Sequence, residues 1–232
     1  MPLIRKLSAE LLGTALLLAT VVGSGVMGQT LAQGNAAIAL LANAGATAAA
    51  LYVLIVLFGP LSGAHFNPAV TLVAGLDGPL GVRTTLAYIA AQVIGAFGGV
   101  LLAHAMFALP LVQAGTHVRS GAAQWLSEGV ATFGLLLTVR LGERQRPDAV
   151  PVLVAAYIFA AYWFTASTSF ANPAVTLARS ITDTFAGIRP ADVAGFVAAQ
   201  LAGALLATGT VRVLLPGAPG AARDPSLAEA NA

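Results

Sequence analysis

The sequence predicts an all-α membrane protein with six transmembrane helices and two re-entrant half-helices in an inverted repeat. Three observations predict this fold class. The 232 residues are 58% hydrophobic and only 9% charged, whereas about a quarter of a soluble domain is charged. Several apolar stretches are long enough to cross a bilayer. The hexapeptide NPAVTL occurs twice, at 67–72 and at 172–177.

Six apolar stretches reach the roughly 20 residues that a helix needs to cross a hydrocarbon core. They are residues 9–27, 36–58, 84–107, 122–141, 149–167 and 191–215. Arg5 and Lys6 before the first stretch resemble the start of a signal peptide. Its length and the five spans that follow favour a first transmembrane helix instead. Abundant Gly and Ala let such helices pack closely in lipid.

Two shorter apolar pieces, 67–76 and 172–181, each begin at an Asn-Pro pair. Asn is a favoured N-cap and Pro is favoured at the first helical position, so each pair predicts a helix start. Ten helical residues rise about 15 Å, which is half of the hydrocarbon thickness. We therefore expect half-helices that enter the membrane and stop there, buried by protein or facing a water-filled cavity.

The two halves of the chain repeat beyond these pairs. AELLGTALLL at 9–18 matches SEGVATFGLLL at 127–137, and AAQVIGA at 90–96 matches AAQLAGA at 198–204. Each half holds three spans, an odd number, so the second half must be inverted relative to the first. Broken segments at matching places in inverted halves point to a pathway at the membrane centre.

The expected domain is a single unit over 1–215, with inverted halves at about 5–110 and 120–215. Tail residues 216–232 are small, polar and rich in Pro and Gly, so we expect a disordered cytoplasmic tail. Basic residues predict cytoplasmic termini, because they are concentrated on one side of the six-span arrangement. That side carries Arg5, Lys6, Arg83, Arg140, Arg144, Arg146, Arg212 and Arg223, against Arg119, Arg179 and Arg189 on the other.

In inverted halves, the two helix starts meet head to head at the membrane centre. Each contributes about half a positive charge from its dipole, and each Asn offers amide donors. Such a centre repels cations and passes neutral polar solutes. One Asn-Pro pair alone would indicate only a helix start, but two in inverted repeats favour a functional centre. Its predicted residues are Asn67, Pro68, Ala69, Asn172, Pro173 and Ala174.

The chain resembles the major intrinsic protein family of aquaporins and aquaglyceroporins. The resemblance covers about residues 5 to 215 and rests on the paired motifs, on SGAHFNPAV at 62–70, and on Glu10 and Glu128 in matching places. It implies an aquaporin-like fold, a separate pore in each protomer and a homotetramer.

The family resemblance also implies a second, outer constriction, which falls on Thr47, Ala160, Ser169 and Val175. In water-selective members of that family, the four sites resemble Phe, His, a small residue and Arg. In glycerol facilitators they resemble Trp, Gly, Phe and Arg. Val175 in place of Arg removes a fixed charge and five N–H donors, so we expect a wider, less demanding filter. Compensation by Arg179 is the alternative, but one helical turn would misplace its charge by about 5 Å.

This filter and the run NPAVTLARSITDTFAGIRPADV resemble a bacterial subgroup of aquaglyceroporins associated with arsenic detoxification. The resemblance implies downhill passage of arsenite, antimonite and methylated arsenicals, with glycerol, urea and some water, across a bacterial-type inner (plasma) membrane. A general glycerol or water facilitator with a relaxed filter is the alternative. An ion-coupled secondary transporter is a weaker one, because we find no carboxylate near the centre of the membrane.

Glu10 and Glu128 are expected to accept hydrogen bonds from buried loop backbone and to support the pore loops, in preference to acting as proton relays. His65 is expected to contact the first loop, with a pH gate as the alternative. The aromatic residues near the end of a span are interpreted as interfacial, namely Tyr157, Tyr162, Trp163 and Phe164.

Several chemistries find no support in the sequence. Cys is absent, and no metal-ligand spacing links His65, His104 and His117, so no metal or cofactor is expected. No nucleophile–base pair or phosphate loop indicates an enzyme. The 11 basic and 9 acidic residues give no concentrated charge for nucleic acid. The expected partners are neutral solutes, membrane lipid and other copies of the chain.

Overall fold

The computed structural model describes residues 1–78 and 80–215, and this part of the chain is helical, with no strand. Its six long helices are α1 (Leu3–Leu31), α2 (Ala36–Ser62), α4 (Val82–Met106), α5 (Ala122–Gln145), α6 (Val150–Phe164) and α8 (Val193–Leu214). Two short helices, α3 (Pro68–Asp77) and α7 (Pro173–Ala178), begin at the Asn-Pro pairs. The all-helical fold class is confirmed. The predicted tail, 216–232, lies outside the described residues.

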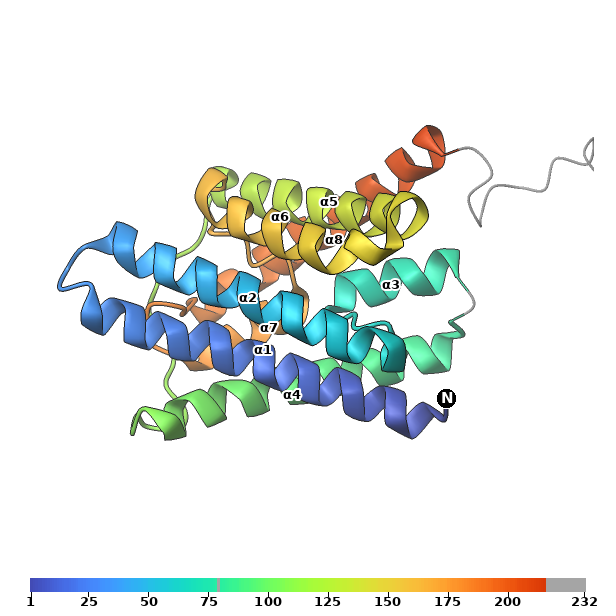
Figure 1. Ribbon diagram of the computed structural model, residues 1–232. Coiled ribbons are helices and arrows are strands. Elements are labelled where there is room, and N and C mark those ends of the chain that lie inside the picture. The colour runs from blue at the N-terminus through green and yellow to red at the C-terminus, as the bar shows by residue number, and fades with distance from the viewer. Residues whose placement is uncertain (79, 216–232) are drawn as a thin grey trace, which may run out of the picture.

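The long helices form two groups of three, one from each half of the chain (Figure 1). Helix α1 packs against α2 and α4, and α5 packs against α6 and α8. The short helices α3 and α7 lie between the groups, and each of them contacts both α4 and α8. The N-terminus and the end of α8 lie at the same end of the molecule, as an even number of crossings requires (Figure 1).

Five helices of the described chain are long and apolar enough to cross a membrane. They begin at or near the starts of α1, α2, α4, α6 and α8. Helix α5 has 24 residues, enough to span, but it is less apolar than the other five. It is the sixth long helix of the bundle and packs against both α6 and α8.

Glycines set the closest helix contacts in both halves. A Cβ added at Gly99 of α4 would overlap the carbonyl oxygen of Ala15 in α1. A Cβ added at Gly203 of α8 would overlap the carbonyl oxygen of Gly129 in α5. Backbones that approach this closely leave no room for a side chain, which is the usual way membrane helices gain contact area in lipid.

The second half-helix is shorter than the sequence predicts. Helix α3 has 10 residues, whereas α7 has 6 and continues as the 3-10 turn η2 (Arg179–Ile181). Backbone N–H groups of a distant loop explain its end, because Gln113 and Gly115 donate to the carbonyls of Ile181 and Ser180 over 3.0 Å each. Carbonyls at a helix C-terminus need such partners when they are buried.

Two further 3-10 turns, η1 (Pro147–Ala149) and η3 (Pro190–Asp192), lead into α6 and α8. In each, Pro occupies the first position, where a missing N–H costs no hydrogen bond.

Candidate functional site

The two Asn-Pro pairs form matching helix starts at the centre of the bundle. The side chain of Asn67 accepts a hydrogen bond from Ala69 N over 2.9 Å, and that of Asn172 accepts from Ala174 N over 3.0 Å. Both Asn residues have extended backbone, and Pro follows each at the first helical position. These are the capping contacts that the sequence pattern predicts.

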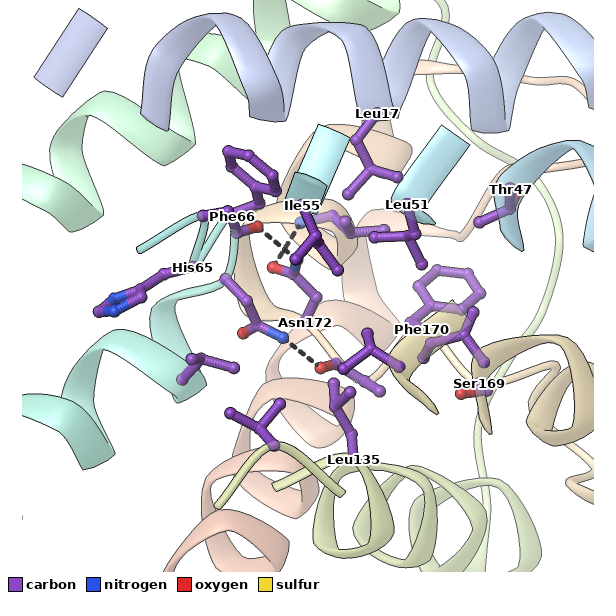
Figure 2. Close-up of a pocket in the computed structure, with 18 of the residues that line it drawn as sticks. Leu17, Thr47, Leu51, Ile55, His65, Phe66, Leu135, Ser169, Phe170 and Asn172 are labelled. Carbon is purple, nitrogen blue, oxygen red and sulfur yellow. Dashed lines mark hydrogen bonds between the residues drawn. The ribbon is translucent and has the colours of Figure 1, made fainter. Parts of the chain in front are cut away.

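Each Asn also reaches across to the other half. The Nδ2 of Asn67 donates to Ala171 O over 2.8 Å, and the Nδ2 of Asn172 donates to Phe66 O over 2.7 Å (Figure 2). The two half-motifs are therefore tied to each other reciprocally. An amide nitrogen carries two hydrogens, so each Asn keeps one N–H for a solute in the cavity that both residues line.

Backbone conformation before the two Asn residues is equally matched. Phe66 has φ of 48° and Ala171 has φ of 46°. Left-handed backbone at non-Gly residues costs free energy and persists only where surrounding contacts fix it. Here it turns the Phe66 and Ala171 carbonyls toward the opposite Asn.

Glu10 holds the first loop in place. Its carboxylate is fully buried and accepts from Ser62 Oγ over 2.6 Å, from His65 N over 3.0 Å and from Phe66 N over 2.8 Å. Gln92 Nε2 donates a fourth bond over 2.8 Å. Four donors satisfy a buried carboxylate without a cationic partner, because each hydrogen bond stabilises its charge.

Glu128 holds the second loop in the same way. It is fully buried and accepts from Phe170 N and Ala171 N over 2.8 Å each, and from Gln200 Nε2 over 2.6 Å. Gln200 also donates to Thr176 Oγ1 over 2.8 Å, as Gln92 does to Thr71 Oγ1. The predicted backbone acceptors thus lie beside the loops that they were expected to support.

A cavity of about 100 Å³ runs past the two Asn residues, with room for several waters. Figure 2 shows Asn172 at its middle, His65 toward one end, and Thr47 and Ser169 toward the other. We call the His65 end the inner end and the Thr47 end the outer end. Apolar side chains complete much of the wall, among them Leu17, Leu51, Ile55 and Leu135.

Two of the four predicted filter residues, Thr47 and Ser169, lie at the outer end (Figure 2), and a third, Val175, lines the cavity in α7 between Asn172 and Arg179. Thr47, Ser169 and Val175 all line the cavity and are 3–5% exposed. The buried hydroxyl oxygen of Ser169 has no hydrogen-bond partner within the described chain.

The fourth predicted residue, Ala160, is corrected by the structure. Ala160 lies on the exposed face of α6 and does not line the cavity. Val154, Ile158 and Tyr162 do, at the four-residue spacing of one helix face. Tyr162 is 3% exposed and donates to Thr47 Oγ1 over 3.3 Å, so it lies inside the bundle beside a predicted filter residue and not at the surface expected of an interfacial aromatic.

His65 lies at the inner end, where its Nδ1 is 3.0 Å from Thr71 Oγ1. The ring also contacts Tyr88, with centroids 5.5 Å apart. These contacts join the loop to α3 and α4, and the role of His65 stays a prediction. In residues 1–78 and 80–215, no group of three His, Asp or Glu residues could hold a metal ion.

Arg179, whose compensation for Val175 was the alternative expectation from the sequence, reaches the cavity. It lines the cavity at the outer end and is 2% exposed. Its Cζ lies 3.3 Å from the centroid of the Phe170 ring, which lines the same end. The outer end therefore contains a guanidinium, one helical turn beyond Val175.

The sequence pattern of the family described as "Major intrinsic protein" matches residues 1–164. The chain belongs to the major intrinsic protein family. It is 59% identical over 213 residues to "Aquaglyceroporin AqpS" of Rhizobium meliloti, covering 92% of this chain and 91% of that protein. It is also 32% identical over 198 residues to "Aquaporin TIP2-3" of Zea mays, covering 77% of each chain.

Among solved structures, the aquaglyceroporin from Plasmodium falciparum superposes with a TM-score of 0.73 at 18% identity. The match covers 93% of this chain and 98% of that one, and it shows the shared fold. As a major intrinsic protein, the chain is a membrane channel for small neutral solutes and is not an enzyme.

Proposed function

We propose that this channel conducts trivalent metalloid hydroxides, namely arsenite and antimonite, and methylated arsenicals, together with glycerol, urea and some water, down their gradients. The observation that carries the proposal is Val175, which lines the cavity at the position where the family resemblance places an Arg. An isopropyl group there offers no charge and no hydrogen bond. Neutral hydroxides such as As(OH)₃ then meet hydroxyl groups on a wall that makes few stereochemical demands.

Two hydroxyl groups support this proposal. Thr47 lines the outer end and Tyr162 bonds to it there, and a hydroxyl can both donate and accept. A solute that carries several OH groups can exchange its water hydrogen bonds for bonds to this wall, which lowers the cost of entering the narrow part of the cavity.

A general glycerol facilitator is the second candidate, and the same end of the cavity favours it. The rings of Phe170 and Tyr162 both line the cavity, and Arg179 gives N–H donors beside Phe170. Glycerol has a carbon edge and a hydroxyl edge, so it fits between an aromatic surface and a donor. Compared with the predicted Ala160, Tyr162 also makes the wall bulkier.

An ion-coupled transporter is less well supported. It would need a carboxylate or an oxygen cluster near the membrane centre. Glu10 and Glu128 are both occupied by hydrogen bonds to the loops, and neither lines the cavity. Flux that rises linearly with solute concentration and ignores a proton gradient is expected for the channel.

We further propose a homotetramer in a bacterial-type inner membrane with both termini cytoplasmic. The excess of basic residues at the end that holds the N-terminus supports this orientation, because positive loops stay in the cytoplasm. The inner end of the cavity then faces the cytoplasm.

Substitution of Val175 tests the proposed selectivity. In proteoliposomes, Val175→Arg should lower arsenite and glycerol permeability by roughly tenfold or more, because a guanidinium fills the outer end, while water still passes. Val175→Leu is the control for added volume without charge. If wild-type vesicles conduct water but neither arsenite nor glycerol, the proposed function fails. If Val175→Arg conducts both solutes as wild type does, Val175 is no filter residue.

A further inference from the structure

Arg179 stands four residues after Val175, at the point where α7 passes into η2. It is the largest of the fully buried side chains in the described chain, and it lines the cavity. Its main chain is fixed as well, because Ile188 N donates to Arg179 O over 3.2 Å. A buried guanidinium beside a solute cavity needs a physical explanation, because burying a charge is costly unless its donors are satisfied.

Most of its donors have no partner in the protein. The Nε of Arg179 donates to Ala186 O, and this is the side chain's one hydrogen bond to any part of the chain that the structure describes. A guanidinium has five N–H groups, so four remain. They belong to a side chain that lines the cavity, so a solute or water at the outer end is the available acceptor.

The ring of Phe170 fixes the guanidinium on one wall. The Cζ of Arg179 lies 3.3 Å from the ring centroid, a cation–π contact. Phe170 is itself held, because its N–H donates to Glu128 Oε1 and its ring packs edge-on against Phe196 with centroids 5.2 Å apart. The charge is therefore fixed in place before a solute arrives, at no further cost in side-chain ordering.

A second arginine provides an internal comparison. Arg119 also lies over Phe170, with its Cζ 5.0 Å from the ring centroid. Its Nε donates to Gly187 O over 2.8 Å and its Nη1 to Ser167 O over 3.3 Å. Arg119 is not among the residues that line the cavity. The two arginines share a ring, but Arg179 alone of the pair reaches the solute path.

We propose that Arg179 is the specificity-determining cation of this channel: it supplies, one helical turn outside Val175, the positive charge and hydrogen-bond donors that the outer constriction lacks at Val175. Its charge repels protons and metal cations, while its free N–H groups bind the hydroxyls of neutral solutes. Because Phe170 and Ala186 hold it to one wall, the channel excludes cations without the narrowing that an Arg at Val175 would cause. The inference deepens the proposed function and rests on the passage of neutral solutes.

The test compares Arg179→Met with Arg119→Met in proteoliposomes, each measured for proton leak, sodium leak and glycerol permeability. Met is apolar, flexible and able to pack against Phe170. For Arg179→Met we expect proton and sodium leak to rise roughly tenfold or more, as removal of a fixed charge near a narrow path requires. Arg119→Met should leave both leaks within about twofold of wild type. Equal leaks in the two variants would overturn the proposal and leave Arg179 a structural residue.

Arg179→Lys keeps the proposal testable if Arg179→Met does not fold. Lys retains the charge but has three N–H donors and no planar group to stack on Phe170. We expect cation exclusion to persist and glycerol permeability to fall by several fold. A cation leak that appears in Arg179→Lys despite its charge would contradict the assignment.

Failure of the proposed function gives a different result. If wild-type vesicles carry glycerol but no arsenite, and Arg179→Met still leaks cations, the arsenical substrate is wrong while the role of Arg179 holds.

Discussion

The two halves of this channel hold their Asn-Pro pairs with corresponding contacts but face different ends of the cavity. Asn67 and Asn172 each cap a short helix and donate to a carbonyl of the other half. Glu10 with Gln92, and Glu128 with Gln200, brace the two loops. These shared contacts fix the centre of the channel, where the two half-motifs must meet.

The differences lie away from that centre. Glu10 accepts an additional hydrogen bond from Ser62, and Thr71 lies against His65 at the inner end. In the second half, Thr176 Oγ1 donates back to Asn172 O over 2.9 Å, and the loop continues to Arg179 at the outer end. The repeat thus preserves the part that positions the amides and varies the part that each solute meets on entering or leaving.

Loss of either loop-bracing carboxylate should have the largest effect. Glu10→Leu leaves two buried and two part-buried donors without their acceptor, and Glu128→Leu leaves three buried donors, so each should cost about 3–5 kcal/mol of stability. Thermal unfolding in detergent measures the difference. Glu143→Leu is the control, because that cavity-lining side chain is 53% exposed and its 3.6 Å ion pair with Arg140 is worth little at such a position. If both variants lose no more stability than the control, the loops do not depend on these carboxylates for their position.

Added methyl groups at the two closest helix contacts test whether both halves are packed equally tightly. Gly99→Ala should push α4 away from α1, and Gly203→Ala should push α8 away from α5. Each should lower the free energy of unfolding by about 2 kcal/mol through overpacking. Gly98→Ala is the control, because a Cβ there meets nothing within 4 Å. A large loss in one half with none in the other would show that the matching contacts are not energetically equivalent.

The smallest expected effect concerns the outer end alone. Tyr162→Phe removes the 3.3 Å hydrogen bond to Thr47 and should cost about 0.5–1.5 kcal/mol, with a modest change in glycerol permeability. Tyr162→Ala should raise the permeability of solutes larger than glycerol, because it removes the aromatic wall. Ala160→Val, on the exposed face of the same helix, should change neither quantity. An effect of Ala160→Val on solute permeability would support Ala160, and not Tyr162, as the residue that the solute meets.

Much of the fold could be predicted because its signals are local and occur twice. Apolar length indicates a span, Asn-Pro indicates a helix start, and a Glu at matching places in two halves indicates a shared role. None of these needs knowledge of a distant contact. The bundle of six long helices and the positions of α3, Glu10 and Glu128 follow from such signals.

The α6 residue at the outer end was predicted wrongly, because counting residues back from Asn172 assumes that the chain continues in one regular register. Helix α6 ends at Phe164, and Thr168, Ser169 and Ala171 then adopt left-handed backbone before the second motif. Counting across that turn selected Ala160. The four-residue spacing from Val154 through Ile158 would have selected Tyr162, because it follows the helix face itself.

The sequence by itself determined that this chain is a membrane channel with two half-helices meeting at paired amides, because lengths, caps and repeats are properties of neighbouring residues. Only the tertiary structure decided what surrounds the solute at the outer end. Arg179 reaches the cavity because Ala186 O, Phe170 and the Ile188 N–H hold it there. Ala186 and Ile188 belong to a loop that folds back after η2, Phe170 belongs to the loop before α7, and no spacing in the sequence encodes their meeting.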